Sequence, residues 1–129
     1  NERENELIAG GSALLAQFMN LTEGRSHNAN GLKIWVSTIT GEVEHRGELK
    51  YHQSWDWIIP VVQRIKNRTY VEDFNYHATL MTEYRDRKAT VMELKVTQDI
   101  LVVFLRCVEF VKWYSTSVGA INSFSHARK

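Results

Sequence analysis

The sequence lacks the residues that build disulfide frameworks and thiolate metal sites. Among its 129 residues there is one cysteine and one proline. Cys107 therefore cannot form a disulfide within the chain, and it lies in an apolar helical pattern, which favours a reducing compartment. We interpret it as a small core residue, because a reactive thiol requires an electropositive and partly exposed setting.

An excess of one charge and long apolar runs are lacking as well. The formal net charge is +1, whereas dedicated nucleic-acid-binding proteins usually carry a strong basic excess. No stretch approaches the roughly 18 consecutive apolar residues of a membrane span, and the N-terminal sequence NERENE is unlike a signal peptide. We therefore expect a cytoplasmic protein with no membrane contact.

The composition is that of one globular domain. Apolar residues make up 43% and charged residues 24% of the chain, and a chain of this length buries roughly two thirds of its unfolded surface. We expect a single domain over residues 1–118. Residues 119–129 show little periodicity, so we expect a C-terminal tail there.

Residues 4–19 carry leucines and Phe18 at helical spacing, which predicts the first helix. Gly10 and Gly11 interrupt the pattern, and each costs about 1 kcal/mol relative to alanine in a helix interior. Either another backbone packs closely over the pair, or the helix breaks there.

The next segment predicts a loop and then a β-hairpin. Residues 20–31 are rich in loop-forming residues, and residues 32–51 hold two extended segments around a glycine turn at Gly41, with Gly47 as a candidate bulge. The first of these strands alternates Leu32, Ile34 and Val36 with Lys33, Trp35 and Ser37.

Residues 69–96 also alternate, which predicts a second pair of strands. The apolar faces comprise Phe74, Tyr76, Ala78 and Leu80 in one strand and Met92, Leu94 and Val96 in the other. The charged tetrapeptide Arg85–Lys88 between them is typical of a solvated hairpin tip.

The last helix is predicted to start at a Thr97 cap with Asp99 in its first turn. Its apolar stripe comprises Ile100, Phe104, Cys107, Val108, Val111 and Tyr114, and further apolar residues widen it. We therefore expect this helix to be central, or to form a homo-oligomer through residues 100–114. The order α-β-β-α-β-β-α predicts an α+β domain of about four antiparallel strands and three helices.

The segment YHQSWDWIIPVVQRI is the most distinctive in the chain. Ile58 to Ile65 predict a core helix, and we expect it to start at Asp56 or Trp57, which places Pro60 within the first turn.

Tyr51, His52, Trp55 and Trp57 precede or open this helix and are our candidate ligand-binding residues. They form either an aromatic plug of the core or a stacking site beside a helix N-terminus that favours an anion. The plug is favoured, because no glycine-rich loop accompanies the aromatic residues.

The sequence also offers two other kinds of site. A nucleic-acid surface would use Arg64, Lys66, Arg68, Arg85, Arg87 and Lys88 with interleaved tyrosines. An enzyme of unrecognised type would be built around His52 and Asp56. The histidine spacings indicate no metal site, and we expect no catalytic residue and no cofactor.

The segment LKYHQSWDWIIPVVQRI resembles a Tyr-His-x-Ser-Trp-Asp-Trp-x-x-Pro-Val-Val motif of small uncharacterised proteins from Bacteroidetes-type bacterial and phage genomes. ELIAGGSALLAQFM and VVFLRCVEFVKWY resemble their first and last helices, but only residues 49–65 match tightly. The resemblance implies an accessory protein of a mobile element. We expect a non-enzymatic binding protein that binds a host protein or sequesters a nucleotide-like ligand, with an anti-defence role.

Overall fold

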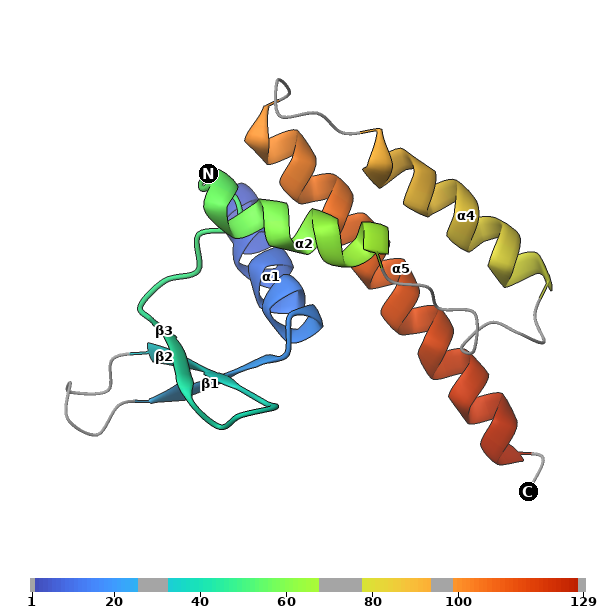
Figure 1. The fold of residues 1–129 in the computed structure, drawn as a ribbon, viewed down its shortest axis with the longest axis horizontal. Coiled ribbons are helices and arrows are strands. Elements are labelled where there is room, and N and C mark those ends of the chain that lie inside the picture. Colours follow the sequence, from blue (N-terminus) through green and yellow to red (C-terminus); the bar gives the residue numbers. More distant parts are fainter. Residues whose placement is uncertain (1, 26–32, 68–77, 94–98, 128–129) are drawn as a thin grey trace.

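The structure is a computed structural model that describes residues 2–25, 33–67, 78–93 and 99–127. Within these residues it contains four helices and a three-stranded antiparallel sheet of order β1-β2-β3 (Figure 1). The elements are α1 (Glu2–Phe18), β1 (Leu21–Arg25), β2 (Lys33–Ser37), β3 (Val43–Arg46), α2 (Trp55–Asn67), α4 (Ala78–Met92) and α5 (Ile100–Ala127). The α+β class is confirmed, whereas the predicted three helices and four strands are not found.

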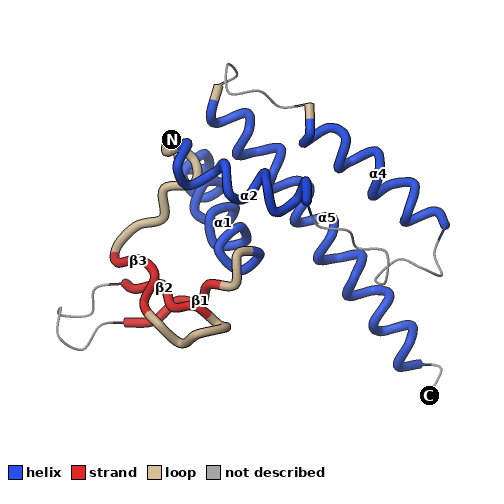
Figure 2. The backbone as a smooth tube through the Cα atoms, viewed as in Figure 1, coloured by secondary structure: helices blue, strands red, loops and turns tan. Residues whose placement is uncertain are grey.

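Helix α5 organises the helical part of the molecule. Helices α1, α2 and α4 all pack against it, and α2 also contacts α4. Figure 2 shows the three strands gathered at one end of the molecule, beside α1 and away from α4. The largest fully buried side chains come from all four helices and include Leu15, Ile58, Val91, Phe104 and Phe110.

Helix α1 runs without a break through its two glycines. A Cβ atom on Gly11 would lie 2.9 Å from Val108 Cγ2 and 3.0 Å from Phe104 Cζ, whereas one on Gly10 would meet nothing within 4 Å. Close packing of α1 on α5 therefore explains Gly11, and the alternative of a broken helix is wrong.

The predicted loop over residues 20–31 is wrong in its first part, because residues 21–25 form strand β1. This strand pairs antiparallel with β2, with Leu21 opposite Ser37 and Arg25 opposite Lys33. Its own residues, LTEGR, show no strand-like apolar alternation. Pairing with β2 holds it in the sheet, and pairing between distant residues is not visible in a local pattern.

The predicted hairpin between β2 and β3 is confirmed, with Gly41 in its turn at a φ of 76°. The bulge is not at Gly47. Trp35 faces His45 and Val36 faces Val43, so Glu44 is the extra residue, and Gly47 follows the strand at a φ of 96°. The more buried face of β2 carries Trp35 and Ser37, rather than the aliphatic residues.

The second predicted pair of strands is wrong where the structure describes it, since α4 occupies residues 78–92. Nine of its 15 residues are alanine, leucine, methionine, arginine, lysine or glutamate, all of which favour helices. Tyr84 and Val91 are buried at a spacing that one helical face accommodates, and Leu80 is half-buried beside them. Phe74, Tyr76, Leu94 and Val96 lie outside the described residues.

Helix α5 begins two residues later than a Thr97 cap would place it. The Asp99 carboxylate accepts a hydrogen bond from the Leu101 N–H at 2.8 Å, and the Asp99 carbonyl accepts from Val102 and Val103, so Asp99 is the N-cap. Thr97 lies outside the described residues. The predicted apolar stripe is confirmed, with Phe104, Cys107 and Val111 fully buried.

The predicted C-terminal tail over residues 119–129 is helical as far as Ala127. Figure 1 shows this end of α5 extending past the other elements. Among the helices that the structure describes, none combines the length and the apolar character needed to cross a membrane.

Candidate functional site

Helix α2 begins at Trp55, earlier than the expected start at Asp56 or Trp57. The Ser54 carbonyl accepts hydrogen bonds from the N–H groups of Trp57 and Ile58, both at 3.1 Å. Pro60 therefore lies beyond the first turn, inside the helix, where it removes one bond of the helical ladder. The core role of the segment is confirmed, since Ile58, Val61 and Ile65 are all fully buried.

The four candidate ligand-binding residues have different environments. Tyr51 is 4% exposed, and burial raises the pKa of its phenol from 10.0 to about 12. Its ring meets the Trp57 ring edge to face at 5.0 Å, and His45 does the same from 4.5 Å. Trp55, Trp57 and His52 are half-buried. Tyr51 therefore belongs to the core, as a plug would, while the other three remain partly accessible.

An aromatic cavity of about 470 Å³ opens on one side of residues 51–57. It lies between the α1–β1 turn, the β2–β3 hairpin and the start of α2. Its lining residues include Leu21, Ile39, Glu44, Tyr51, Asp56 and Trp57. Both charged residues that line it, Glu44 and Asp56, are acidic, and Glu44 is the bulge residue of β3. β-Bulges commonly redirect a side chain in this way.

A second, polar cavity of about 420 Å³ lies between α1, the sheet and the segment before α2. Ser12, His52, Glu23, Lys33, Glu48 and Trp35 are among its lining residues. The Ser12 hydroxyl and the His52 Nδ1 atom are buried and have no hydrogen-bond partner among the described residues. Lys33 Nζ and the Glu23 carboxylate form an ion pair at 3.6 Å. The candidate residues Tyr51 and Trp57 thus line one cavity, and His52 lines the other.

The structure does not assemble the enzyme site that sequence reasoning weighed. His52 lines the polar cavity and Asp56 lines the aromatic one, so the two side chains do not face a common substrate. Cys107 is fully buried, and burial raises the pKa of its thiol to about 12, which keeps it protonated and unreactive near neutral pH. Within the described ranges, no three His, Cys, Asp or Glu side chains gather in a group that could hold a metal.

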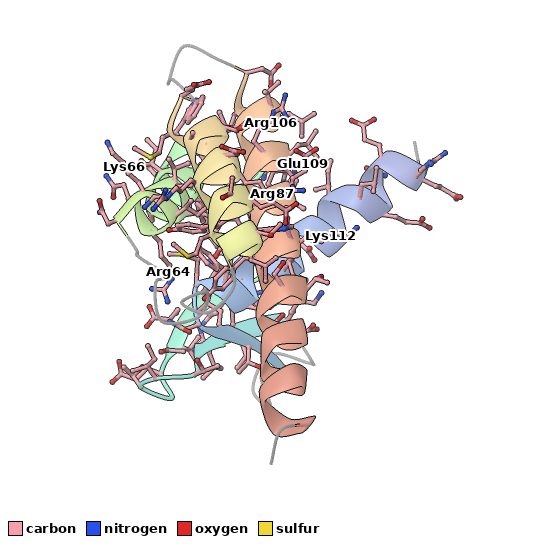
Figure 3. All side chains as sticks on the ribbon, turned by 90° about the vertical axis from the view of Figure 1, so that its right-hand side faces the viewer. Arg64, Lys66, Arg87, Arg106, Glu109 and Lys112 are labelled. Carbon is pink, nitrogen blue, oxygen red and sulfur yellow. The ribbon has the colours of Figure 1, made fainter. Side chains whose placement is uncertain are left out.

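The basic residues of the nucleic-acid alternative do not form one face. Figure 3 shows Arg64 and Lys66 on α2, apart from Arg87, which lies with Arg106 along α4 and α5. Arg85, Arg87 and Lys88 stand on a helix, so the predicted hairpin tip is wrong. Arg68 lies outside the described residues.

Several of these basic side chains already lie over aromatic rings of the protein. Arg64 lies over Phe18 at 5.4 Å, Arg87 over Trp113 at 5.3 Å and Lys88 over Tyr84 at 5.5 Å. Tyr84 is 5% exposed, so its ring is not available to stack on a base. The cavity beside Arg87 and Arg106 has a volume of about 140 Å³, below the size of common ligand sites, and Glu109 also lines it.

Sequence reasoning missed Ser12, and it considered Glu44 only as a metal-ligating or acid–base partner of His52 and Asp56, not as part of a docking cavity. Ser12 carried a usable signal, because it lies three and four residues before Leu15 and Ala16. This spacing places it on the same face of the helix, and both of those residues are fully buried. For Glu44 the sequence contains no such signal, since its position depends on the register of β3 against β2.

No family model, curated protein or solved structure matches the chain.

Proposed function

We propose that this chain is a non-enzymatic binding protein that docks a segment of a partner protein in the aromatic cavity. The single observation that carries the proposal is the combination of an aromatic and aliphatic lining with a rim whose charged residues are both acidic. A volume of about 470 Å³ suits one or two large side chains of a partner.

The apolar lining continues onto the surface of the hairpin. Ile39 is 76% exposed at the rim of the cavity, and Val43, at the start of β3, is 42% exposed. Exposed aliphatic side chains beside a cavity that contains a half-buried tryptophan are typical of an interaction surface. The occupant is therefore expected to present a large apolar side chain.

The rim determines the charge of the partner. Glu44 and Asp56 oppose a phosphate or a carboxylate, even though the start of α2 lies nearby and a helix N-terminus alone would favour an anion. A lysine or arginine next to the apolar side chain would meet both carboxylates. The acidic rim therefore favours a partner protein over a nucleotide-like ligand at this cavity.

The adjoining surface extends the docking site along α2. A neighbouring cavity of about 420 Å³ shares Met19 and Pro60 with the aromatic cavity and is also lined by Arg64. A partner segment that crosses both would place its basic residue near Glu44 and Asp56, and an acidic or amide residue near Arg64. The order of charges along the partner is thereby specified.

Selection of randomised displayed peptides on the full chain tests the proposal. We expect the selected peptides to share a large apolar residue next to lysine or arginine. The double variant Glu44→Lys, Asp56→Lys should weaken their binding by about tenfold or more, because like charges then face each other.

The matched control is Glu42→Lys, which changes the charge of an exposed residue of the same hairpin outside the cavity lining. It should leave binding within about twofold, as expected of a screened surface charge. Acidic selected peptides, or equal effects of the control and the double variant, would contradict the proposal.

The biological role that we propose is that of a mobile-element accessory factor acting on a host protein in the cytoplasm, with an anti-defence role. This part rests on the resemblance of residues 49–65.

Self-association through residues 100–114 stays a prediction. Val102 and Leu105 are 41% and 42% exposed on α5, and sedimentation velocity of the wild type and of Val102→Glu would test it.

A further inference from the structure

The first turns of α1 project from the rest of the fold. Residues 2–7 are all exposed, and the first buried residue of the helix is Gly11, which packs on α5. Figure 3 shows this end of α1 extending away from the other elements. It nevertheless carries Leu7, which is 62% exposed. A single exposed leucine is common on a protein surface, so the neighbouring surface decides whether it marks an interface.

Helix α5, which α1 crosses at Gly11, also carries an exposed apolar face. Val102 and Leu105 are 41% and 42% exposed. Arg106 and Glu109 are exposed as well and form an ion pair at 3.6 Å, and Figure 3 shows them one below the other along α5. The four residues are spaced i, i+3, i+4 and i+7, so they share one stripe of the helix.

Helix α1 presents a stripe of the same spacing. Its exposed residues at i, i+3, i+4 and i+7 are Arg3, Glu6, Leu7 and Gly10. When α5 of a second copy lies antiparallel to this stripe, Leu7 is level with the second copy's Leu105. In the same register Glu6 is level with Arg106, and Arg3 is level with Glu109. Apolar side chains thus meet at one level, and each charge is matched by its opposite.

The glycine of the stripe fits the same register, because Gly10 is level with the second copy's Val102. A Cβ atom on Gly10 meets nothing within 4 Å in the single chain, although glycine is unfavourable in a helix interior. The fold of one chain therefore gives no reason for a glycine at this position. Close approach of another helix would explain Gly10, as contact with α5 explains Gly11.

The directions of the two helices are compatible with a twofold dimer. Figures 1 and 3 show α1 and α5 of one chain running in the same general direction. A twofold axis perpendicular to them reverses both helices in the second copy. Helix α1 of each copy then lies antiparallel to α5 of the other, so the contact occurs twice and the assembly closes as a dimer.

We propose that two copies of this chain form a twofold dimer in which residues 2–10 of α1 pack antiparallel on residues 102–109 of α5 from the other copy. The proposal rests on the self-association proposed above for residues 100–114, and it identifies the surface that covers them. The apolar contacts provide affinity, and the opposite charges determine the register. None of these residues lines the aromatic cavity, so the dimer interface and the docking surface are formed by different residues.

Sedimentation velocity of the full chain at concentrations from about 1 μM to about 1 mM tests the proposal. We expect a reversible equilibrium between monomer and dimer. Leu7→Glu should weaken dimerisation by about tenfold or more, because the symmetric interface then receives two carboxylates at apolar positions. The matched control is Val43→Glu, which changes an aliphatic side chain that is 42% exposed on β3. It should dimerise as the wild type does.

A charge exchange tests the register. Glu6→Arg and Arg106→Glu should each weaken dimerisation by about threefold or more, because like charges then lie level with each other. The double variant Glu6→Arg, Arg106→Glu restores opposite charges at both copies of the contact. Its dimerisation should return to within about threefold of the wild type, which a general loss of helix stability would not produce.

Three results would overturn the proposal while circular dichroism shows every variant to be folded. The first is a wild type that stays monomeric throughout the concentration range, which would also end the self-association prediction but would leave peptide binding at the aromatic cavity unaffected. The second is a dimer that Val102→Glu weakens and Leu7→Glu does not, which would place the contact between two α5 helices. The third is a double variant that dimerises more weakly than either single variant.

Discussion

The two cavities on either side of residues 51–57 have similar volumes and different chemistry. In the aromatic cavity the buried serine is satisfied, since Ser37 Oγ accepts hydrogen bonds from the N–H groups of Ile39 and Thr40, both at 3.1 Å. In the polar cavity Ser12 Oγ has no partner among the described residues. The Ser37 hydroxyl thus stabilises the fold at the aromatic cavity, whereas the unpaired Ser12 hydroxyl lowers the stability of the fold at the polar cavity.

The difference distinguishes a surface that suits docking from a region of lower stability. The aromatic cavity presents exposed aliphatic side chains beside the core residue Tyr51, which suits docking of a partner that brings its own apolar side chain. Ser12 and His52 line the polar cavity, and each has a buried polar atom without a partner among the described residues, which lowers the stability of the fold there. The predictions below change one cavity at a time.

The largest effect is expected where the polar cavity joins the core. Gly11 precedes Ser12 and packs directly against Val108 and Phe104 of α5. Gly11→Leu should lower the free energy of unfolding by about 3 kcal/mol through overpacking. Chemical denaturation measures this loss.

Gly10 provides the matched control, because a side chain there meets nothing within 4 Å. Gly10→Ala should raise the free energy of unfolding by up to about 1 kcal/mol through helix propensity. Equal effects at the two glycines would contradict the close packing of α1 on α5.

The second effect concerns Tyr51 in the wall of the aromatic cavity. Burial raises its pKa from 10.0 to about 12, so the unfolded chain loses the phenolic proton at lower pH than the folded chain. The stability that this group provides is intact below pH 10 and lost as the pH rises through 12. The loss should reach about 2 to 3 kcal/mol.

Urea denaturation of wild type and Tyr51→Phe across this pH range isolates the tyrosine. Cys107, whose pKa burial also raises to about 12, contributes equally to both proteins. The Tyr51→Phe protein should lose less stability between pH 10 and 12. Parallel curves would show that Tyr51 ionises as easily in the folded state as in the unfolded one.

The smallest effects compare the two serines. Ser37→Ala leaves two backbone N–H groups without their acceptor, so it should cost about 2 kcal/mol. Ser12→Ala removes an unpaired hydroxyl from a helix, so it should raise the free energy of unfolding by about 1 kcal/mol. If both variants lose stability equally, the Ser12 hydroxyl has a partner.

Periodicity predicted those elements in which one face is buried against a neighbour. Helices α1, α2 and α5 follow the 3.6-residue pattern, and the β2–β3 hairpin follows alternation and the Gly41 turn. Strand β1 was missed because pairing with β2 holds it in the sheet, whereas its own residues show no apolar alternation. Helix α4 was assigned as strand because Ala78, Leu80 and Met92 continue an alternation that runs through residues 69–96, and its helix-forming composition was given too little weight.

The candidate site was predicted in part. Composition singled out residues 51–57, and the structure places them between two cavities. Which side each residue faces could not be read from the sequence, because the turn before α2 sends Tyr51 and His52 to opposite cavities. Glu44 depends on a bulge and required the tertiary structure, whereas the spacing of Ser12 from Leu15 and Ala16 already places it on the buried face of α1.

The most direct test of the account is one NMR experiment on the indole N–H signals of Trp35 and Trp57. Trp35 lines the polar cavity and Trp57 the aromatic one. The account predicts that a selected basic and apolar peptide shifts the Trp57 signal and leaves the Trp35 signal unchanged. A selected peptide that shifts the Trp35 signal instead, or that shifts neither signal, would contradict it.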